Sequence, residues 1–148
     1  MRRRIGWTAV FIILSLALVQ PASTASQRHL SGGGTASLSQ VAMNVWISDS
    51  GTATGSFECL MAGRSAFAIA GFGLAHNMIV HATPTKGSVV GANVTFSGPG
   101  RLTLDGKTKL DVQVEVRVDV GTQTFQLSVL GVATIDPETM QTGQLVLR

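Results

Sequence analysis

The amino-acid sequence predicts an all-β fold: a single-domain antiparallel β-barrel or β-sandwich of about eight strands, rich in consecutive hairpins, after an N-terminal signal helix. Three observations favour this fold. Short segments along most of the chain alternate apolar and polar residues. Gly, Asn, Asp and Ser stand between these segments, as they do in turns. Beyond the N-terminus, no window keeps the 3.6-residue apolar period of an amphipathic helix.

Residues 1–25 have the organisation of a secretory signal peptide. A basic start at Arg2, Arg3 and Arg4 is followed by an apolar run at 5–19 and by small residues at 22–25. The alternative, an uncleaved membrane anchor, needs roughly 20 apolar residues, more than this run supplies. We therefore expect cleavage after Ala25, a secreted or periplasmic product, and no membrane attachment after cleavage.

Cleavage would remove the excess positive charge of the chain. Three of the eleven Lys and Arg residues lie at 2–4, so eight remain against eight Asp and Glu, and the formal charge of the mature chain is zero. No basic stripe is left that could follow a phosphate backbone. The composition thus argues against a nucleic-acid partner.

The mature chain is predicted to be one domain with a short leader. Residues 26–36 read SQRHLSGGGTA, and the three consecutive glycines indicate a flexible Gly/Ser leader. Residues 37–148 are numerous enough to bury one core and show no internal repeat. Strands are expected at 38–48, 54–62, 66–72, 77–83, 87–90, 93–97, 101–104, within 108–131, and at 143–148.

The segment 108–131 predicts a β-hairpin whose register follows from parity. Valines occupy even positions from 112 to 120, whereas the apolar residues that follow occupy the odd positions 125, 127 and 129. Both strands face one core only if paired residue numbers sum to an odd number. A two-residue loop at Gly121-Thr122 meets this condition and indicates a type II′ turn with positive φ at Gly121. The expected pairs are Val118 with Phe125, Val116 with Leu127 and Val114 with Val129 on the core face, and Arg117 with Gln126 in solvent.

The preceding hairpin requires an odd-numbered loop. Leu102 and the valines after it are all even, so a two-residue loop at Asp105-Gly106 would turn the two apolar faces apart. We expect a type I turn with Gly106 in a left-handed bulge position, and not the common type I′ turn. Together the two hairpins predict a three-stranded meander from Arg101 to Gly131.

Cys59 is the single cysteine, so an internal disulfide is excluded. It shares a strand face with Phe57 and Met61, which indicates a buried, inert thiol. The alternative is a reactive or dimer-forming cysteine. We expect the domain to fold without a metal, another cofactor or a disulfide.

His76, His81 and Glu58 are the residues on which an active or metal site would have to be built. Histidines five positions apart lie on opposite faces of a regular strand, and zinc sites need three or four convergent ligands. The interpretation we favour is one loop histidine and one half-buried strand histidine. No G-x-S-x-G nucleophile motif is present.

Trp46 is the candidate ligand-binding residue. In VAMNVWIS the apolar residues at odd positions 41–47 are predicted to face the core, which leaves Trp46 on the opposite face with Asn44 and Ser48. An exposed Trp on a strand can be a platform for a sugar ring or a partner surface. The alternative is a Trp46 covered by the leader or a loop, since large aromatic side chains are usually buried.

The segments GSFECLMAG, AHNMIVHATP, FSGPGRLTLDG and TGQLVLR resemble those of a group of uncharacterised secreted bacterial proteins with a signal, a Gly-rich leader and a small β-domain. The resemblance covers most of the mature chain. It implies an exported bacterial protein and brings no activity, ligand or catalytic residue.

Three functions are compatible with these observations. The favoured one is an exported, non-catalytic domain that binds a ligand, a protein or a cell-surface partner through loops at one end of the barrel. The second is a small metal-dependent or hydrolytic enzyme centred on His76, His81 and Glu58. The third is a structural or surface-assembly protein whose edge strands pair between molecules.

We predict that the exported protein begins at Ser26, because the basic, apolar and small-residue regions stand in the order that signal cleavage requires. N-terminal sequencing of the product released by expressing cells measures this directly. A released chain that retains Met1 would contradict the prediction.

Overall fold

A computed structural model of the chain describes residues 26–63 and 76–148. The expected signal peptide at 1–25 and the expected strand at 66–72 lie outside the described residues. Within the two described ranges, no helix has the length and apolarity that crossing a membrane requires.

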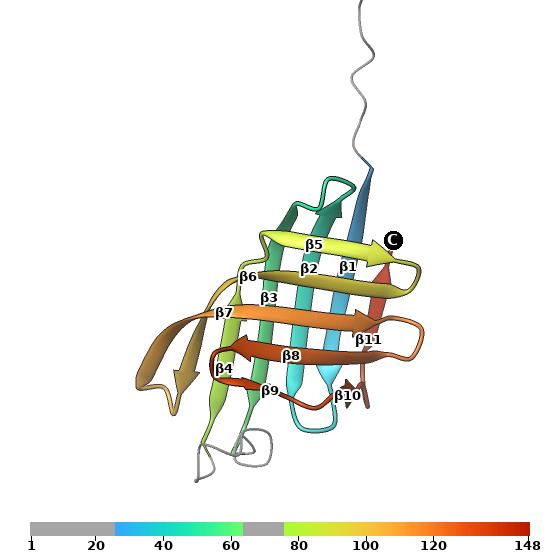
Figure 1. The fold of residues 1–148 in the computed structure, drawn as a ribbon. Helices are drawn as coiled ribbons and strands as arrows, with labels where there is room; N and C mark the ends of the chain where they lie inside the picture. The colour runs from blue at the N-terminus through green and yellow to red at the C-terminus, as the bar shows by residue number, and fades with distance from the viewer. Residues whose placement is uncertain (1–25, 64–75) are drawn as a thin grey trace, which may run out of the picture.

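The described residues form eleven β-strands (Figure 1). Their bounds are β1 Gln27–Thr35, β2 Gln40–Ser48, β3 Ala53–Met61, β4 Met78–Ala82, β5 Lys86–Val90, β6 Asn93–Leu104, β7 Thr108–Asp119, β8 Thr124–Leu130, β9 Ala133–Thr134, β10 Glu138–Thr139 and β11 Gln144–Leu147. The expected strands at 93–97 and 101–104 are one continuous strand, β6, and β9 and β10 have only two residues each.

All strands belong to one antiparallel sheet, in the order β10-β8-β7-β6-β4-β3-β2-β1-β11, with β5 beside β6 and β9 beside β8. Figure 1 shows the sheet curled into two layers, in which β5, β6, β7 and β8 cross over β1, β2, β3 and β11. Strand β6 joins the layers because its first half pairs with β5 and its second half with β4. The predicted all-β, antiparallel, barrel-like fold is confirmed.

One hydrophobic core lies between the two layers. In β2 the odd-numbered apolar residues are buried and the even-numbered ones exposed, as the alternation predicted. The largest fully buried side chains come from both layers, and Phe57 of β3 meets Phe96 of β6 edge to face with ring centroids 5.7 Å apart. Such aromatic pairs stabilise a core beyond the area they bury.

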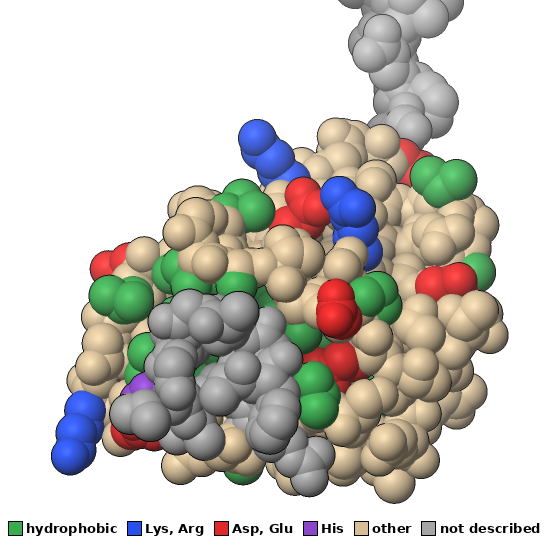
Figure 2. Space-filling view, turned by 60° about the horizontal axis from the view of Figure 1, so that its bottom comes forward, with side chains coloured by type: hydrophobic (Ala, Val, Ile, Leu, Met, Phe, Trp, Pro, Cys, Tyr) green, Lys and Arg blue, Asp and Glu red, His purple; other side chains and the backbone are tan. Residues whose placement is uncertain are grey.

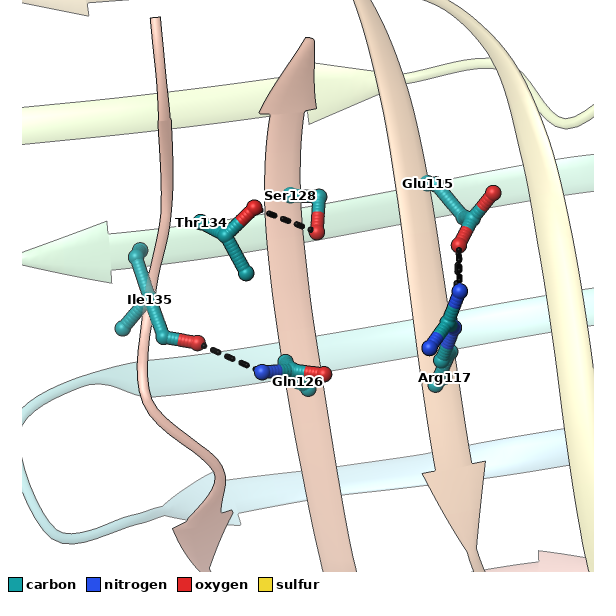
Figure 3. A network of polar contacts seen from close by, with 6 residues as sticks. All are labelled: Glu115, Arg117, Gln126, Ser128, Thr134 and Ile135. Atoms are coloured by element: carbon teal, nitrogen blue, oxygen red, sulfur yellow. Dashed lines mark hydrogen bonds and ion pairs between the residues drawn. The ribbon is translucent and has the colours of Figure 1, made fainter.

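The predicted register of the meander is confirmed. Strands β7 and β8 pair Val118 with Phe125 and Arg117 with Gln126, and β6 pairs with β7 over its whole length. The valines of β7 from 114 to 118 are buried, while the opposite face is polar. Figure 3 shows that polar face, where Arg117 donates to Glu115 at 2.9 Å and Gln126 donates to the Ile135 carbonyl at 3.2 Å.

The predicted type II′ turn at Gly121 is wrong. The ladder ends with Asp119 opposite Thr124, so the loop has four residues, and the positive φ of 56° belongs to Gln123. A four-residue loop has the same parity as a two-residue one, which is why the register survives. The Asp119 carboxylate accepts hydrogen bonds from the backbone of Thr122 at 3.2 Å and Gly121 at 2.8 Å, which hold the pKa of Asp119 below its usual value.

The loop between β6 and β7 has an odd number of residues, as predicted. Leu104 pairs with Thr108, and Gly106 has a φ of 68°. Asp105 also has a positive φ, 49°, so the two residues carry the φ signs of a type I′ turn and Lys107 is the additional residue. The expectation of a type I turn is therefore wrong. Asp105 is held in this conformation by Asn77, whose backbone N–H donates to its carboxylate at 2.9 Å.

The expected flexible leader is a strand of the sheet. Strand β1 pairs with β2 on one side and with β11 on the other, and Leu30 and Ala36 are buried in the core. Gly32 and Gly34 have φ values of 140° and 151°, and a Cβ on either would collide with a backbone carbonyl of the segment 142–144. The glycines permit this close backbone approach. The β-domain thus begins at Gln27 and not at residue 37.

Two polar side chains join segments at the ends of the sheet. The buried Glu138 carboxylate accepts hydrogen bonds from the backbone of Leu38 at 2.7 Å and Ser39 at 3.0 Å, and from the Ser39 hydroxyl at 3.0 Å. The Gln123 side chain donates to the Leu145 carbonyl at 3.0 Å and accepts from the Leu145 N–H at 2.8 Å. Gln123 thereby connects the start of β8 with β11.

Truncating Phe125 to Ala should lower the free energy of unfolding by about 3 to 5 kcal/mol, because the ring is buried in the core and would leave a cavity. Arg117→Ala, on the exposed face of the same hairpin, should change it by no more than about 0.5 kcal/mol. Denaturant unfolding of both variants measures the difference. Equal losses for the two would contradict the orientation of the hairpin.

Candidate functional site

An open groove of about 670 Å³ lies on the outer face of the sheet, on the side of β2, β3 and β4 that faces away from the core. The second half of β6 and the first half of β7 complete it. Polar side chains in its lining include Asn44, Ser56, Glu58, His81, Arg101 and Asp111.

The strand register arranges the outward side chains of this face in three rows. The charged row consists of Glu58, His81, Arg101 and Asp111, each the direct cross-strand neighbour of the next. The neutral row consists of Ser31, Asn44 and Ser56, and the aromatic row of His29, Trp46 and Thr54. Successive rows are two residues apart along β2 and β3, or roughly 7 Å.

Trp46 is on the outer face, as predicted, and 43% of its surface is exposed. Its ring is stacked on that of His29, with centroids 3.9 Å apart and an angle of 5° between the planes. His29 Nε2 lies 2.6 Å from Asn44 Oδ1, so a residue that lines the groove also orients the stack. The leader residue covers part of Trp46 without burying it.

The charged row contains two side-chain pairs, His81 with Glu58 and Arg101 with Asp111, so that the two carboxylates lie at the ends of the row. His81 Nδ1 lies 3.2 Å from Glu58 Oε2, and Arg101 donates to Asp111 Oδ1 at 3.3 Å. The row therefore combines two carboxylates with one guanidinium and one imidazole. It offers hydrogen-bond acceptors and donors side by side.

The structure gives His76 and His81 different carboxylate partners. His76 Nδ1 lies 2.5 Å from Asp105 Oδ2 at the tip of the β6–β7 hairpin, and this hydrogen bond holds the pKa of Asp105 below its usual value. Only His81 reaches Glu58. In the part of the chain that the structure describes, no three His, Cys, Asp or Glu residues are grouped so that they could hold a metal ion. A joint metal site at His76 and His81 gains no support from this geometry.

The His81 and Glu58 side chains do not form a sheltered acid–base pair. They are 58% and 52% exposed, respectively, and water screens charges in such positions. General acid–base catalysis relies on environments that shift a pKa towards the working pH, usually by burial. An enzyme centred on His76, His81 and Glu58 thus has only two of its three residues in contact.

Cys59 faces the core, as the strand pattern predicted, and is fully buried. Burial raises the pKa of its thiol to about 12, and hydrogen bonding to Ser39 offsets only part of this effect. The thiolate, which is the reactive form, is therefore scarce at neutral pH. This cysteine is structural.

The charged side chains of the described residues can be followed on one further face of the molecule. Figure 2 shows the molecule turned so that the end with the β1–β2 connection comes forward, and acidic and basic side chains are interspersed on that face.

Several residues of this site were missed by sequence reasoning. His29 was assigned to the leader, and Arg101 and Asp111 were treated only as parts of the meander. The odd loop between β6 and β7 already implies that Arg101 and Asp111 are paired, since their numbers sum to the same value as those of Leu102 and Leu110. The pairing of β4 with β6, which brings His81 to Arg101, has no such local signal.

Cys59 should not react with a water-soluble disulfide reagent at neutral pH in the folded protein, because the thiol is buried and protonated. The same reagent should label one thiol per chain in denaturant. Absorbance of the released thiolate measures both rates. Rapid labelling of the folded protein would show a reactive cysteine.

No known protein-family model, curated protein or solved structure matches this chain. The groove and its three rows of side chains are therefore the basis on which a function can be assigned.

Proposed function

We propose that this chain is an exported, non-catalytic binding domain that holds a small polar ligand in the outer groove. The observation that carries the proposal is the groove itself, about 670 Å³ in volume, with the exposed Trp46 two residues along β2 from Asn44 of its lining. Ligand sites combine a concave surface with a few convergent polar groups, and this groove has both.

The position of the groove favours binding by the outer face of the sheet over binding by the loops. Its polar side chains come from strands β2, β3, β4, β6 and β7, each of which is fixed by neighbours in the sheet. A site on paired strands is more rigid than one on loops, so less conformational entropy is lost when a ligand binds. The proposal therefore moves the binding surface from loops, as the sequence led us to expect, to the outer sheet face.

Two features favour binding over catalysis. In the charged row, His81 is already paired with Glu58 and Asp111 with Arg101, and these side chains are open to water. The single cysteine is buried and protonated. The groups that would attack or transfer protons in a hydrolase are thus either screened or inaccessible, whereas the same groups can bind polar ligands as they stand.

The two ends of the main strand order argue against assembly by strand pairing between molecules, whereas β5, which pairs with β6 alone, is a further edge. The sheet order ends at β10 and β11, which have two and four residues. The backbone N–H and C=O of Leu145 in β11 are hydrogen bonded to the Gln123 side chain. Short edges with occupied backbone groups are poor templates for another chain.

Export is the second part of the proposal, to the periplasm or the outside of a bacterial cell. It is supported by the signal-like organisation of residues 1–25. A neutral, cofactor-free domain that binds a polar molecule is suited to such a location.

The proposal is tested by filling the groove. Ser56→Trp places a large side chain in the groove, and Arg117→Trp places the same side chain on an exposed face about 20 Å away along β7. Neutral oligosaccharides, short peptides, nucleotides and amino acids are screened as ligands by thermal unfolding. A ligand that binds only the folded state raises the unfolding temperature by mass action.

At least one class of ligand should raise the unfolding temperature of the wild type and of Arg117→Trp, and should have little effect on Ser56→Trp. A screen in which no class stabilises the protein would contradict the proposal. Equal stabilisation of Ser56→Trp would place the site elsewhere and contradict it as well.

A further inference from the structure

The aromatic row presents a flat, held ring beside the groove. Trp46 is 43% exposed although a side chain of this size is normally buried. The parallel stacking of His29 and its 2.6 Å contact with Asn44 fix the plane of the indole. A ring that is both exposed and immobilised loses little conformational entropy when a ligand packs on it.

The neutral and charged rows continue from this ring with hydrogen-bonding groups of both kinds. Asn44 and Ser56 lie next along β2 and β3, and they can each donate and accept. Glu58 beyond them accepts, and Arg101 donates. The order from the aromatic row to the charged row is therefore an apolar face, then amide and hydroxyl groups, then charge-assisted partners.

Strands β2 and β3 of the groove cannot recognise a peptide backbone by strand addition. Strand β2 is paired with β1 and β3, and β3 is paired with β2 and β4. Their backbone groups are already used, so only side chains can contact a ligand. The floor is made of small or polar residues such as Ala42 and Ser56, which offer no deep apolar pocket for a peptide side chain.

The charge of the groove is unsuited to strongly ionic ligands. Arg101 contacts Asp111 and His81 contacts Glu58, so each carboxylate has a nitrogen-bearing side chain beside it. A polyanion would meet the two carboxylates, and a polycation would meet the guanidinium. A ligand rich in hydroxyl groups and without net charge suits the mixture of donors and acceptors.

We infer that the ligand is a neutral saccharide, with one sugar ring stacked on Trp46 and its hydroxyl groups bound by Asn44, Ser56 and the charged row. This inference rests on the proposed function and adds the chemical class of the ligand. A pyranose has an apolar C–H face and a rim of hydroxyl groups, each of which can donate and accept. Those two surfaces match the aromatic row and the neutral row, respectively.

The experiment is an array of neutral oligosaccharides probed with the purified protein, followed by calorimetric titration of the best hit. Trp46→Ala should weaken binding at least tenfold, and Trp46→Phe should retain part of the affinity because it keeps a ring. Asn44→Ala should also weaken binding, since it removes a groove contact and releases His29. Arg117→Ala on the remote part of β7 should leave the affinity unchanged. Unfolding temperatures of all variants verify that they are folded.

The outcomes separate this inference from the proposed function. If peptides or nucleotides bind in a way that Ser56→Trp blocks while the array is silent, the groove is a binding site and the saccharide inference is wrong. If a saccharide binds the wild type and folded Trp46→Ala equally well, the role of the aromatic row is wrong. If no ligand of any class depends on the groove, both proposals fail.

Discussion

Strand β6 changes partners halfway along its length, and both the core and the groove depend on this change. Its first half pairs with β5 and its second half with β4, and Gly98 and Pro99 lie between the two ladders. A Cβ at Gly98 would collide with the Thr83 carbonyl, and Pro99 accepts a hydrogen bond from Thr83 N at 2.9 Å. The sheet can therefore turn from one layer to the other without a break, as Figure 1 shows. The concave side of the turn encloses the core, and the other side brings Arg101 of β6 next to His81 of β4 in the groove.

At the ends of the sheet, side-chain hydrogen bonds hold neighbouring segments together. Short strands β10 and β11 supply few backbone hydrogen bonds, and side chains complete the structure in their place. Glu138 satisfies two backbone N–H groups and one hydroxyl group with a buried carboxylate. A charged group that is buried has to be fully hydrogen bonded, because an unpartnered charge in the core would destabilise the fold by several kcal/mol. Glu138 and Gln123 therefore determine how the ends of the sheet are positioned, although neither contacts the groove.

Local patterns in the sequence were sufficient for part of this structure. The even and odd positions of Val118 and Phe125 fix the pairing of β7 with β8, because a register shift by one residue would expose one of the apolar faces. The turn types could not be derived in the same way, because Gln123 is stabilised in a positive φ by Leu145, which is distant in the sequence. Likewise, the glycines at 32–34 led to the prediction of a flexible leader, because the sequence does not show that β11 packs closely against them. The outward position of Trp46 followed from alternation alone, whereas the charged row required the pairing of β4 with β6.

The pairing of β1 with β11 has a consequence for how the chain acquires its fold. Leu30 pairs with Leu147, so more than a hundred residues separate two neighbours in the sheet. Contacts of such high contact order form late, because the entropy lost in closing the loop comes before the stabilisation gained. When the chain is synthesised from its N-terminus, residues 27–35 can pair with β2 early. They lack their other neighbour, β11, until residues 144–147 have been made. During that interval the unpaired edge of residues 27–35 could pair with another chain. The three glycines at 32–34 disfavour such pairing, since glycine has little tendency to form a strand on its own.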